Sequence, residues 1–166
     1  MLRKIGQKRI QSRGGNFAIV ASRYNPRYVD AMVRAAKTEL RRAGASKIQI
    51  VRVPGAYEIP VVATRLARIA SRPAPRTSGL SAIICLGVVL RGETVHAAHI
   101  GEAVSQALME IQLKYEVPVV HEVLLLENEM QARVRCLARK FNRGTEAAQT
   151  AMAMSRAMAG LSAAAS

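Results

Sequence analysis

Aromatic side chains and cysteine are scarce in this chain of 166 residues, and each shortage restricts what it can be. There is no Trp, and only 4% of the residues are aromatic although 50% are hydrophobic, so the core must be aliphatic. The two cysteines, Cys85 and Cys136, are too few for a disulfide framework and lack metal-ligand spacing. We therefore expect a cytoplasmic protein in which Cys85 is a core residue and not a reactive one.

Long apolar runs and the common catalytic motifs are also missing. No apolar run reaches the ~18 residues that a membrane-spanning helix needs. The chain contains no Walker-type phosphate loop, no GxGxxG, no GxSxG and no HExxH pattern. Nothing in the sequence indicates metal catalysis or hydride transfer, and we expect neither a metal nor a cofactor.

Acidic residues are few as well. The chain has 25 Lys and Arg against 11 Asp and Glu, a net charge of +14, and its first 29 residues hold seven basic residues and no acid. Such a surplus attracts polyanions in general, so non-specific polyanion binding stays open. An Arg-rich, acid-poor start is also typical of transit peptides. However, a strand is predicted from Asn16 onwards, which leaves only a basic arm over residues 1–15.

What the sequence does contain is a regular alternation of strands and helices. Short apolar runs predict strands at Phe17–Ser22, Ile48–Val53, Leu80–Leu90 and Pro118–Leu126. Helical stripes and helix-end signals predict helices at Tyr28–Ala43, Glu58–Ala70, His96–Tyr115, Asn128–Lys140 and Asn142–Leu161. This order favours an α/β fold, a three-layer αβα sandwich around a four-stranded parallel sheet. We expect one domain over residues 16–161, followed by a short tail at 162–166.

The loop Arg91–His96 follows the most apolar strand and is the strongest candidate for chemistry. In doubly wound sheets ligands bind beyond the carboxyl ends of the strands. Backbone amides at a helix start favour an anion, and Thr94 can cap that helix or donate to a phosphate. His96 titrates near neutrality and can transfer protons. An ordinary capped helix with a surface histidine explains the same residues equally well.

Two further regions have both a functional and a plain interpretation. In Pro54–Glu58, Tyr57 offers a flat face beside the hydrogen-bond acceptor Glu58, which suits a polyol or a heteroaromatic ring. Taken alone, the segment is better explained by a Pro-Gly turn that leads to an N-terminal Glu favouring the helix dipole. The basic residues of the last two helices are either a solvated face or include one guanidinium that binds a phosphate. Glu146 either favours a helix dipole or orients a histidine.

Taken together, four segments resemble the lumazine synthase family, in order along the chain from about Asn16 to about Met158. They are Ser22–Asn25 (SRYN), Val53–Pro60 (VPGAYEIP), Gly87–His96 (GVVLRGETVH) and Asn142–Ala148 (NRGTEAA). The resemblance implies a flavodoxin-like fold. It also implies a transferase of riboflavin biosynthesis that condenses 5-amino-6-(D-ribitylamino)uracil with 3,4-dihydroxy-2-butanone 4-phosphate. The products are 6,7-dimethyl-8-ribityllumazine, phosphate and water, and no cofactor is needed.

The resemblance also implies roles for residues and an assembly. His96, Arg135 and Glu146 would be catalytic, and Glu93, Thr94 and Arg135 would bind the phosphate. The aminouracil and its ribityl chain would be held by Tyr24, Asn25, Ala56, Tyr57, Glu58, Val89, Leu90 and His121. Members of the family form homopentamers, decamers or icosahedral shells, so we expect an active site between subunits.

Several positions depart from the family pattern. His121 stands where an aromatic residue is frequent, Glu122 replaces a usual Gly, and Leu125-Leu126 replaces Thr-Thr. The Ser71–Ser78 connection is longer than usual. Two alternatives to the synthase therefore stay open. One is a paralogue that binds lumazine or flavin without catalysis, and the other is a polyanion-binding or shell protein.

Overall fold

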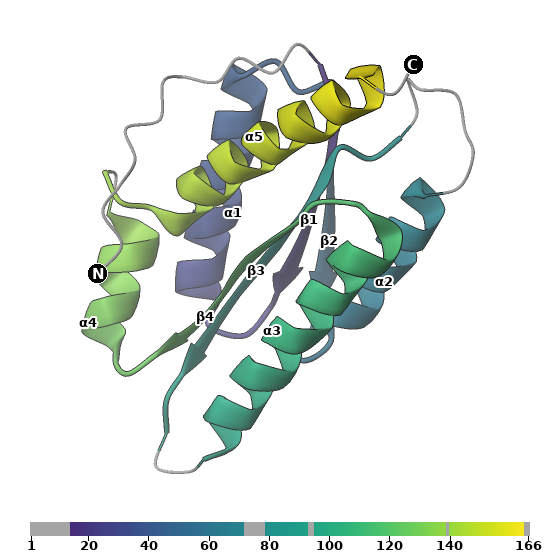
Figure 1. Cartoon of the computed structure of the whole chain (residues 1–166). Coiled ribbons are helices and arrows are strands. Elements are labelled where there is room, and N and C mark those ends of the chain that lie inside the picture. Colours follow the sequence, from purple (N-terminus) through teal and green to yellow (C-terminus); the bar gives the residue numbers. More distant parts are fainter. Residues whose placement is uncertain (1–13, 72–78, 93–94, 139, 165–166) are drawn as a thin grey trace.

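The computed structural model describes residues 14–71, 79–92, 95–138 and 140–164. A parallel four-stranded sheet lies between two layers of helices (Figure 1). Its strands are β1 (Asn16–Ser22), β2 (Lys47–Val53), β3 (Ala82–Leu90) and β4 (Val119–Leu126), in the order β2-β1-β3-β4. The α/β class, the parallel sheet and the flavodoxin-like sandwich are thereby confirmed.

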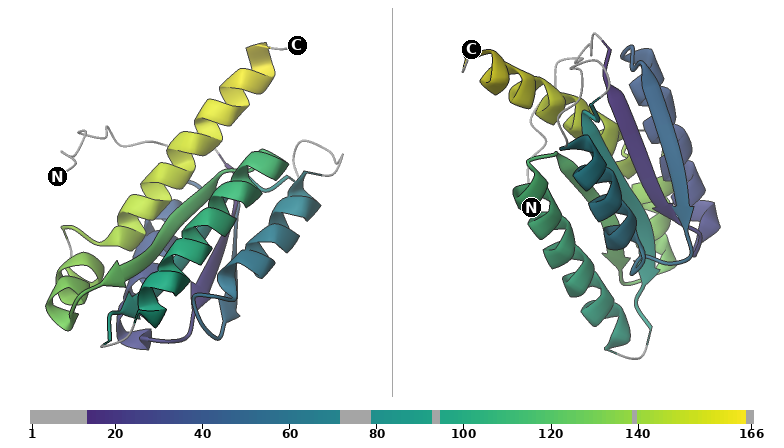
Figure 2. Two further views of the ribbon diagram at one scale, coloured as in Figure 1. Left: turned by 60° about the horizontal axis from the view of Figure 1, so that its bottom comes forward. Right: turned by 90° about the vertical axis from the view of Figure 1, so that its right-hand side faces the viewer.

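The two faces of the sheet carry different helices, as Figure 2 shows. One face is covered by α1 (Pro26–Arg42), α4 (Glu129–Ala132), the π-helix η1 (Arg133–Leu137) and α5 (Arg143–Ala164). The other is covered by α2 (Ile59–Ala70) and α3 (His96–Tyr115). Within the described residues, no helix is long and apolar enough to span a membrane.

Most predicted boundaries agree with the structure to within a few residues, and α3 has the predicted ends. The predicted helix at Asn128–Lys140 is the main exception. It forms one α-helical turn, continues as the π-helix η1 and ends at Leu137, because Ala138 is extended at φ −66 and ψ 126. A π-helix of five residues is about one turn long, too short for a period that could be recognised in the sequence. Helix α5 also runs beyond the predicted Leu161, to Ala164.

The central strands β1 and β3 are buried on both faces, as parallel sheets require. One apolar cluster fills the layer under α1 and α5 and a second fills the layer under α2 and α3. Cys85 of β3 is fully buried, and burial raises the pKa of its thiol above the ordinary range. This confirms that Cys85 is a core residue. Cys136 is also buried, and both cysteines are free thiols.

Two glycines shape the layer that contains α1 and α5: one ends α1, and the other lets the two helices approach. Gly44 follows the end of α1 at φ 88 and donates its amide to the carbonyl of Arg41 over 3.0 Å, as predicted for a helix terminator. At Gly144 a Cβ would overlap the carbonyl oxygen of Met32. The glycine of the NRGTEAA segment therefore lets α5 contact the backbone of α1.

Candidate active site

A cavity of about 840 Å³ lies at the carboxyl ends of β1, β2 and β3, on the face covered by α2 and α3. Its walls come from the loops after β1 and β2, from the last residues of β3 and from the first two turns of α3. The lining residues are Tyr24, Asn25, Gly55, Ala56, Tyr57, Glu58, Val88, Val89, Leu90, His96, His99, Ile100 and Ala103. Eight of the residues predicted to form the site are therefore brought together, from segments far apart in the sequence.

The side chain of Asn25 fixes the loop after β1 to the neighbouring strand β3. Asn25 adopts φ 53, in the left-handed region that Asn tolerates better than most residues. Its Nδ2 donates to the carbonyl oxygen of Val88 over 2.8 Å. Tyr24, beside it, leaves 69% of its surface exposed at the cavity. The loop thus presents an uncovered aromatic ring from a fixed backbone.

The loop after β2 is closed by Glu58, whose Oε2 accepts from the amide of Gly55 over 2.8 Å. A Cβ on Gly55 would come within 2.8 Å of that carboxylate and 3.2 Å of the Tyr24 ring, so only glycine fits without a shift. Tyr57 is 64% exposed at the same edge. Glu58 therefore closes this turn with one carboxylate oxygen and lines the cavity as well.

The loop after β3 leads into α3. The amide of Arg91 donates to the carbonyl of Leu126 over 2.8 Å, and its guanidinium pairs with Glu127 at 2.9 Å. Glu93 and Thr94, predicted to bind phosphate, lie outside the described residues. Val95 precedes α3 and supplies no side-chain cap. His96 is the first residue of the helix, is exposed and faces the cavity.

Sequence reasoning missed the wall that α3 contributes. His99, which the motifs do not single out, lines the cavity together with Ile100 and Ala103. These residues follow His96 by three, four and seven positions, the spacing of one helix face. The spacing could have predicted this wall, because residues on the same face of a helix as His96 lie on the same side of the site.

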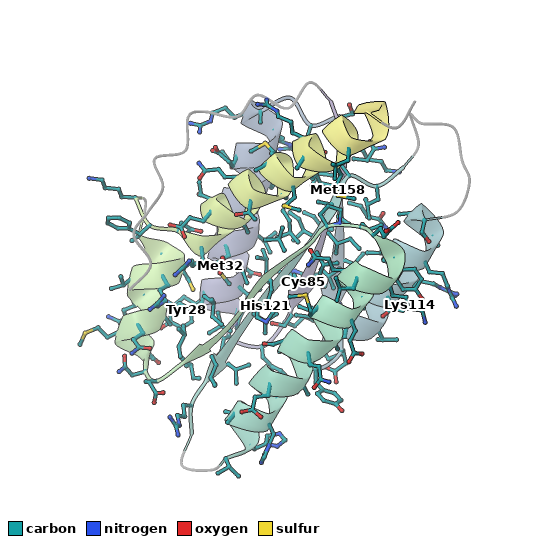
Figure 3. All side chains as sticks on the ribbon, viewed as in Figure 1. Tyr28, Met32, Cys85, Lys114, His121 and Met158 are labelled. Atoms are coloured by element: carbon teal, nitrogen blue, oxygen red, sulfur yellow. The ribbon has the colours of Figure 1, made fainter. Side chains whose placement is uncertain are left out.

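Three predicted site residues, His121, Arg135 and Glu146, do not line this cavity. His121 lies on the edge strand β4, on the side of α3 (Figure 3). Its Nε2 is 2.8 Å from the Oγ of Ser105, and burial lowers the pKa of the ring. The histidine is therefore held mainly as a neutral imidazole.

A cluster of charged residues occupies the opposite face of the sheet, and we call Glu122, Arg135, Arg143 and Glu146 the charged cluster. Arg143 Nη1 lies 3.0 Å from Glu146 Oε2 and 3.9 Å from Glu122 Oε1. Burial raises the pKa of Glu122 to about 7, with a smaller opposing effect from Arg143. Arg135 is an exposed residue of η1. Glu146 and Arg135 therefore face a different side of the protein from His96.

Comparison with known proteins decides the family. A model of the 6,7-dimethyl-8-ribityllumazine synthase family matches residues 14–159. Proteins of that name from Stenotrophomonas maltophilia (strain R551-3) and Xylella fastidiosa (strain 9a5c) are 39% and 38% identical over 140 and 143 residues. The matches cover 83% and 85% of this chain, and 85% and 88% of the relatives. The chain belongs to the 6,7-dimethyl-8-ribityllumazine synthase family.

Family membership confirms the resemblance and, with it, a transferase of riboflavin biosynthesis. In this lumazine synthase fold the SRYN, VPGAYEIP and GVVLRGETVH segments all contribute to the cavity. The NRGTEAA segment instead starts α5 and packs on α1. Within the described residues, no group of three or more His, Cys, Asp or Glu side chains is placed to hold a metal ion.

A buried hydroxyl lies at the end of β1, just before the loop that carries Tyr24. Ser22 is 1% exposed, and its Oγ has no hydrogen-bond partner in the described part of the chain. A Cβ on Gly87 would lie 3.5 Å from this oxygen and 3.1 Å from Val123. The glycine of the GVVLRGETVH segment therefore leaves room for the side chains packed beneath the end of β3.

Proposed function

We propose that the protein catalyses the condensation of 5-amino-6-(D-ribitylamino)uracil with 3,4-dihydroxy-2-butanone 4-phosphate, giving 6,7-dimethyl-8-ribityllumazine, phosphate and water. The observation that carries the proposal is the cavity in which Tyr24, Glu58 and His96 meet at the strand ends. This placement suits a reaction whose main requirement is that two substrates are held together.

The aminouracil is assigned to the wall formed by the first two loops. The exposed ring of Tyr24 offers a stacking surface for the heterocycle. We assign the uracil edge to backbone groups of Val89 and Leu90, which line the cavity at the end of β3. Glu58 accepts from ribityl hydroxyls with the oxygen that does not hold Gly55, and Ala56 and Tyr57 support the chain.

His96 is assigned to proton transfer. The amine nitrogen forms a bond to the ketone carbon, and the carbonyl oxygen must gain protons before it leaves as water. An imidazole at the cavity wall can deliver and remove these protons near neutral pH. Removal of the proton from the adjacent hydroxyl-bearing carbon then lets inorganic phosphate leave the four-carbon unit, and the enol that remains becomes a ketone. The ribitylamino nitrogen closes the ring on that ketone carbon, and a second water leaves. We propose that Glu93 (through the backbone amide), Thr94 and Arg135 bind the phosphate and stabilise its negative charge.

Arg135, Glu146 and His121 can serve this cavity only from a second copy of the chain. Arg135 and Glu146 belong to elements on the far face of the sheet, and His121 lies on its edge. A ring of copies joined head to tail would bring the region of one copy that carries β4, η1 and the start of α5 to the cavity of the next. We therefore propose a homopentamer, or a multiple of pentamers up to an icosahedral shell, with the site between subunits. Two buried free thiols fit a cytoplasmic location.

The direct test mixes the purified protein with both substrates and follows formation of the lumazine chromophore. The expected result is turnover above the uncatalysed background, and a His96→Asn variant should lower kcat by about 10²-fold, the size of one general acid–base contribution. A wild-type protein that gives no more product than buffer would contradict the proposal.

A second candidate is a paralogue that binds lumazine or flavin without turnover. It is favoured by His121, because the ring is bonded to Ser105 and cannot replace a freely stacking aromatic residue without breaking that bond. The cavity contact of His96 argues against it, since a pure binder needs no proton carrier. Tight riboflavin binding by calorimetry, without product formation, would support this candidate over the synthase.

A further inference from the structure

Helix α1 presents a line of basic side chains to solvent. Arg27, Arg34 and Arg41 are seven residues apart, close to two helical turns, so they lie along one face and span about 21 Å. Lys37 lies on the same side, one turn from both Arg34 and Arg41. We call these four residues the α1 basic stripe. The three arginines are exposed and Lys37 is half-buried.

The acids of α1 do not neutralise this stripe, because both are occupied elsewhere. Asp30 pairs with Arg52 of β2. Glu39 pairs with Arg42 at 2.7 Å and accepts from Gln149 at 3.2 Å.

Among the residues that the structure describes, the stripe has no ion-pair partner. In the described ranges, no carboxylate lies within ion-pair distance of Arg34, Lys37 or Arg41. Arg27 lies over the Tyr28 ring, 5.9 Å from its centroid. The positive charge of the stripe is therefore uncompensated by its surroundings.

Neither the fold nor the proposed reaction explains the stripe. The packing of α1 depends on its opposite side, through Tyr28, Val29, Met32, Val33, Ala36 and Leu40. A cation in the last turn favours the helix dipole, which accounts for Arg41 but not for Arg34 in the middle of the helix. None of the four residues lines the cavity.

We propose that the α1 basic stripe binds the phosphate backbone of a double-stranded nucleic acid. A duplex carries about one negative charge per 1.7 Å of its axis, so several phosphates face a stripe of about 21 Å. The stripe contains no aromatic side chain on which an unpaired base could stack, which favours a duplex over a single strand. The contact is made by guanidinium and ammonium groups alone, so it positions the backbone without reading sequence.

The test compares two full-length triple variants that lose the same charge. R34Q/K37Q/R41Q removes most of the stripe. R65Q/R68Q/K114Q removes two arginines and one lysine that are exposed on α2 and α3. Binding of a fluorescent 24-base-pair duplex is followed by anisotropy between about 50 and 200 mM salt, where counterion release sets the slope. Gel filtration and the unfolding midpoint establish that each variant is folded and assembled like the wild type.

We expect the wild type to bind with an affinity that falls steeply with salt. The stripe variant should lose about two to three units of the log–log slope, at roughly 0.9 per phosphate contact, and the control variant less than one. The charge-preserving variant R34K/K37R/R41K should bind like the wild type. The proposal is overturned if the wild type does not bind at the lowest salt, or if the two neutralising variants lose equal slope. A single strand of equal length that binds more tightly than the duplex would also overturn it.

Discussion

The side-chain amide of Asn25 donates to the carbonyl oxygen of Val88 over 2.8 Å. This bond joins the loop after β1 to the end of β3, two walls of the cavity that lie 63 residues apart in the sequence. Because Val88 is the residue before Val89 and Leu90, the bond also fixes the backbone to which we assign the uracil edge. The carbonyl is a pure acceptor, so position 25 requires a donor.

Asn25→Asp should therefore impair both stability and catalysis. A carboxylate of the same size cannot donate to Val88 and places a negative charge beside its carbonyl oxygen. We expect a loss of about 1–3 kcal/mol in the free energy of unfolding and a lower kcat/KM. Asn128→Asp is the matched control, because Asn128 accepts from the amide of Gln131 at 3.0 Å and aspartate accepts equally well. Equal effects of the two substitutions would contradict this account.

Gly144→Ala should prevent stable packing of α5 on α1. The added methyl group would overlap the carbonyl oxygen of Met32, and backbone cannot move aside as a flexible side chain can. We expect a loss of at least about 3 kcal/mol in the free energy of unfolding, the upper range for overpacking a core. Gly160→Ala tests the same change on the same helix where nothing lies within 4 Å of the new Cβ. That control should gain roughly 0.5–1 kcal/mol from helix propensity, as measured by chemical denaturation.

The contrast between what the sequence predicted and what it missed has a physical cause. The strands, α3 and the cavity-lining loops follow from local patterns, because apolar periodicity and the strand-end rule act over short segments. The π-helix η1 is only five residues long, so no periodic pattern marks it in the sequence. The separation of Arg135 and Glu146 from His96 depends on which face of the sheet each helix covers. The motif order along the chain does not contain that information.

Glu122 should make the free energy of unfolding fall as the pH rises from about 4.5 to about 7. Its pKa rises from an ordinary 4.5 to about 7 in the folded protein, chiefly through burial. Between these values the unfolded chain releases a proton that the folded protein keeps, so the free energy of unfolding falls as pH rises. A shift of this size corresponds to a loss of about 3 kcal/mol per site at most between pH 4.5 and 7.

The measurement compares denaturation midpoints at pH 5 and pH 8, at one protein concentration, because assembly also affects apparent stability. Glu122→Gln should remove most of the decline, since a neutral amide of similar size replaces the titrating group. Glu102→Gln, at an exposed position of α3, provides the control. A Glu122→Gln variant that declines as steeply as the wild type would show that another group carries the effect.

The proposed site between subunits predicts that two inactive variants restore each other. His96→Ala damages the cavity of its own subunit, and Arg135→Ala damages the arginine that this subunit offers to a neighbour. In a ring assembled at random from equal amounts, about one quarter of the interfaces combine an intact His96 with an intact Arg135, because a head-to-tail ring uses a different surface on each side. Co-assembled protein should therefore recover about a quarter of the wild-type kcat per subunit, as long as sites act independently.

Three comparisons make that result decisive. Each variant alone should stay near the background rate, and mixing them without dissociation and reassembly should change nothing. Co-assembly of His96→Ala with His96→Asn should recover no activity, because every cavity then lacks its histidine. If His96→Ala and Arg135→Ala also fail to recover activity in verified mixed oligomers, both residues act within one subunit. The described structure would then have to rearrange, since it places Arg135 outside the cavity that His96 lines.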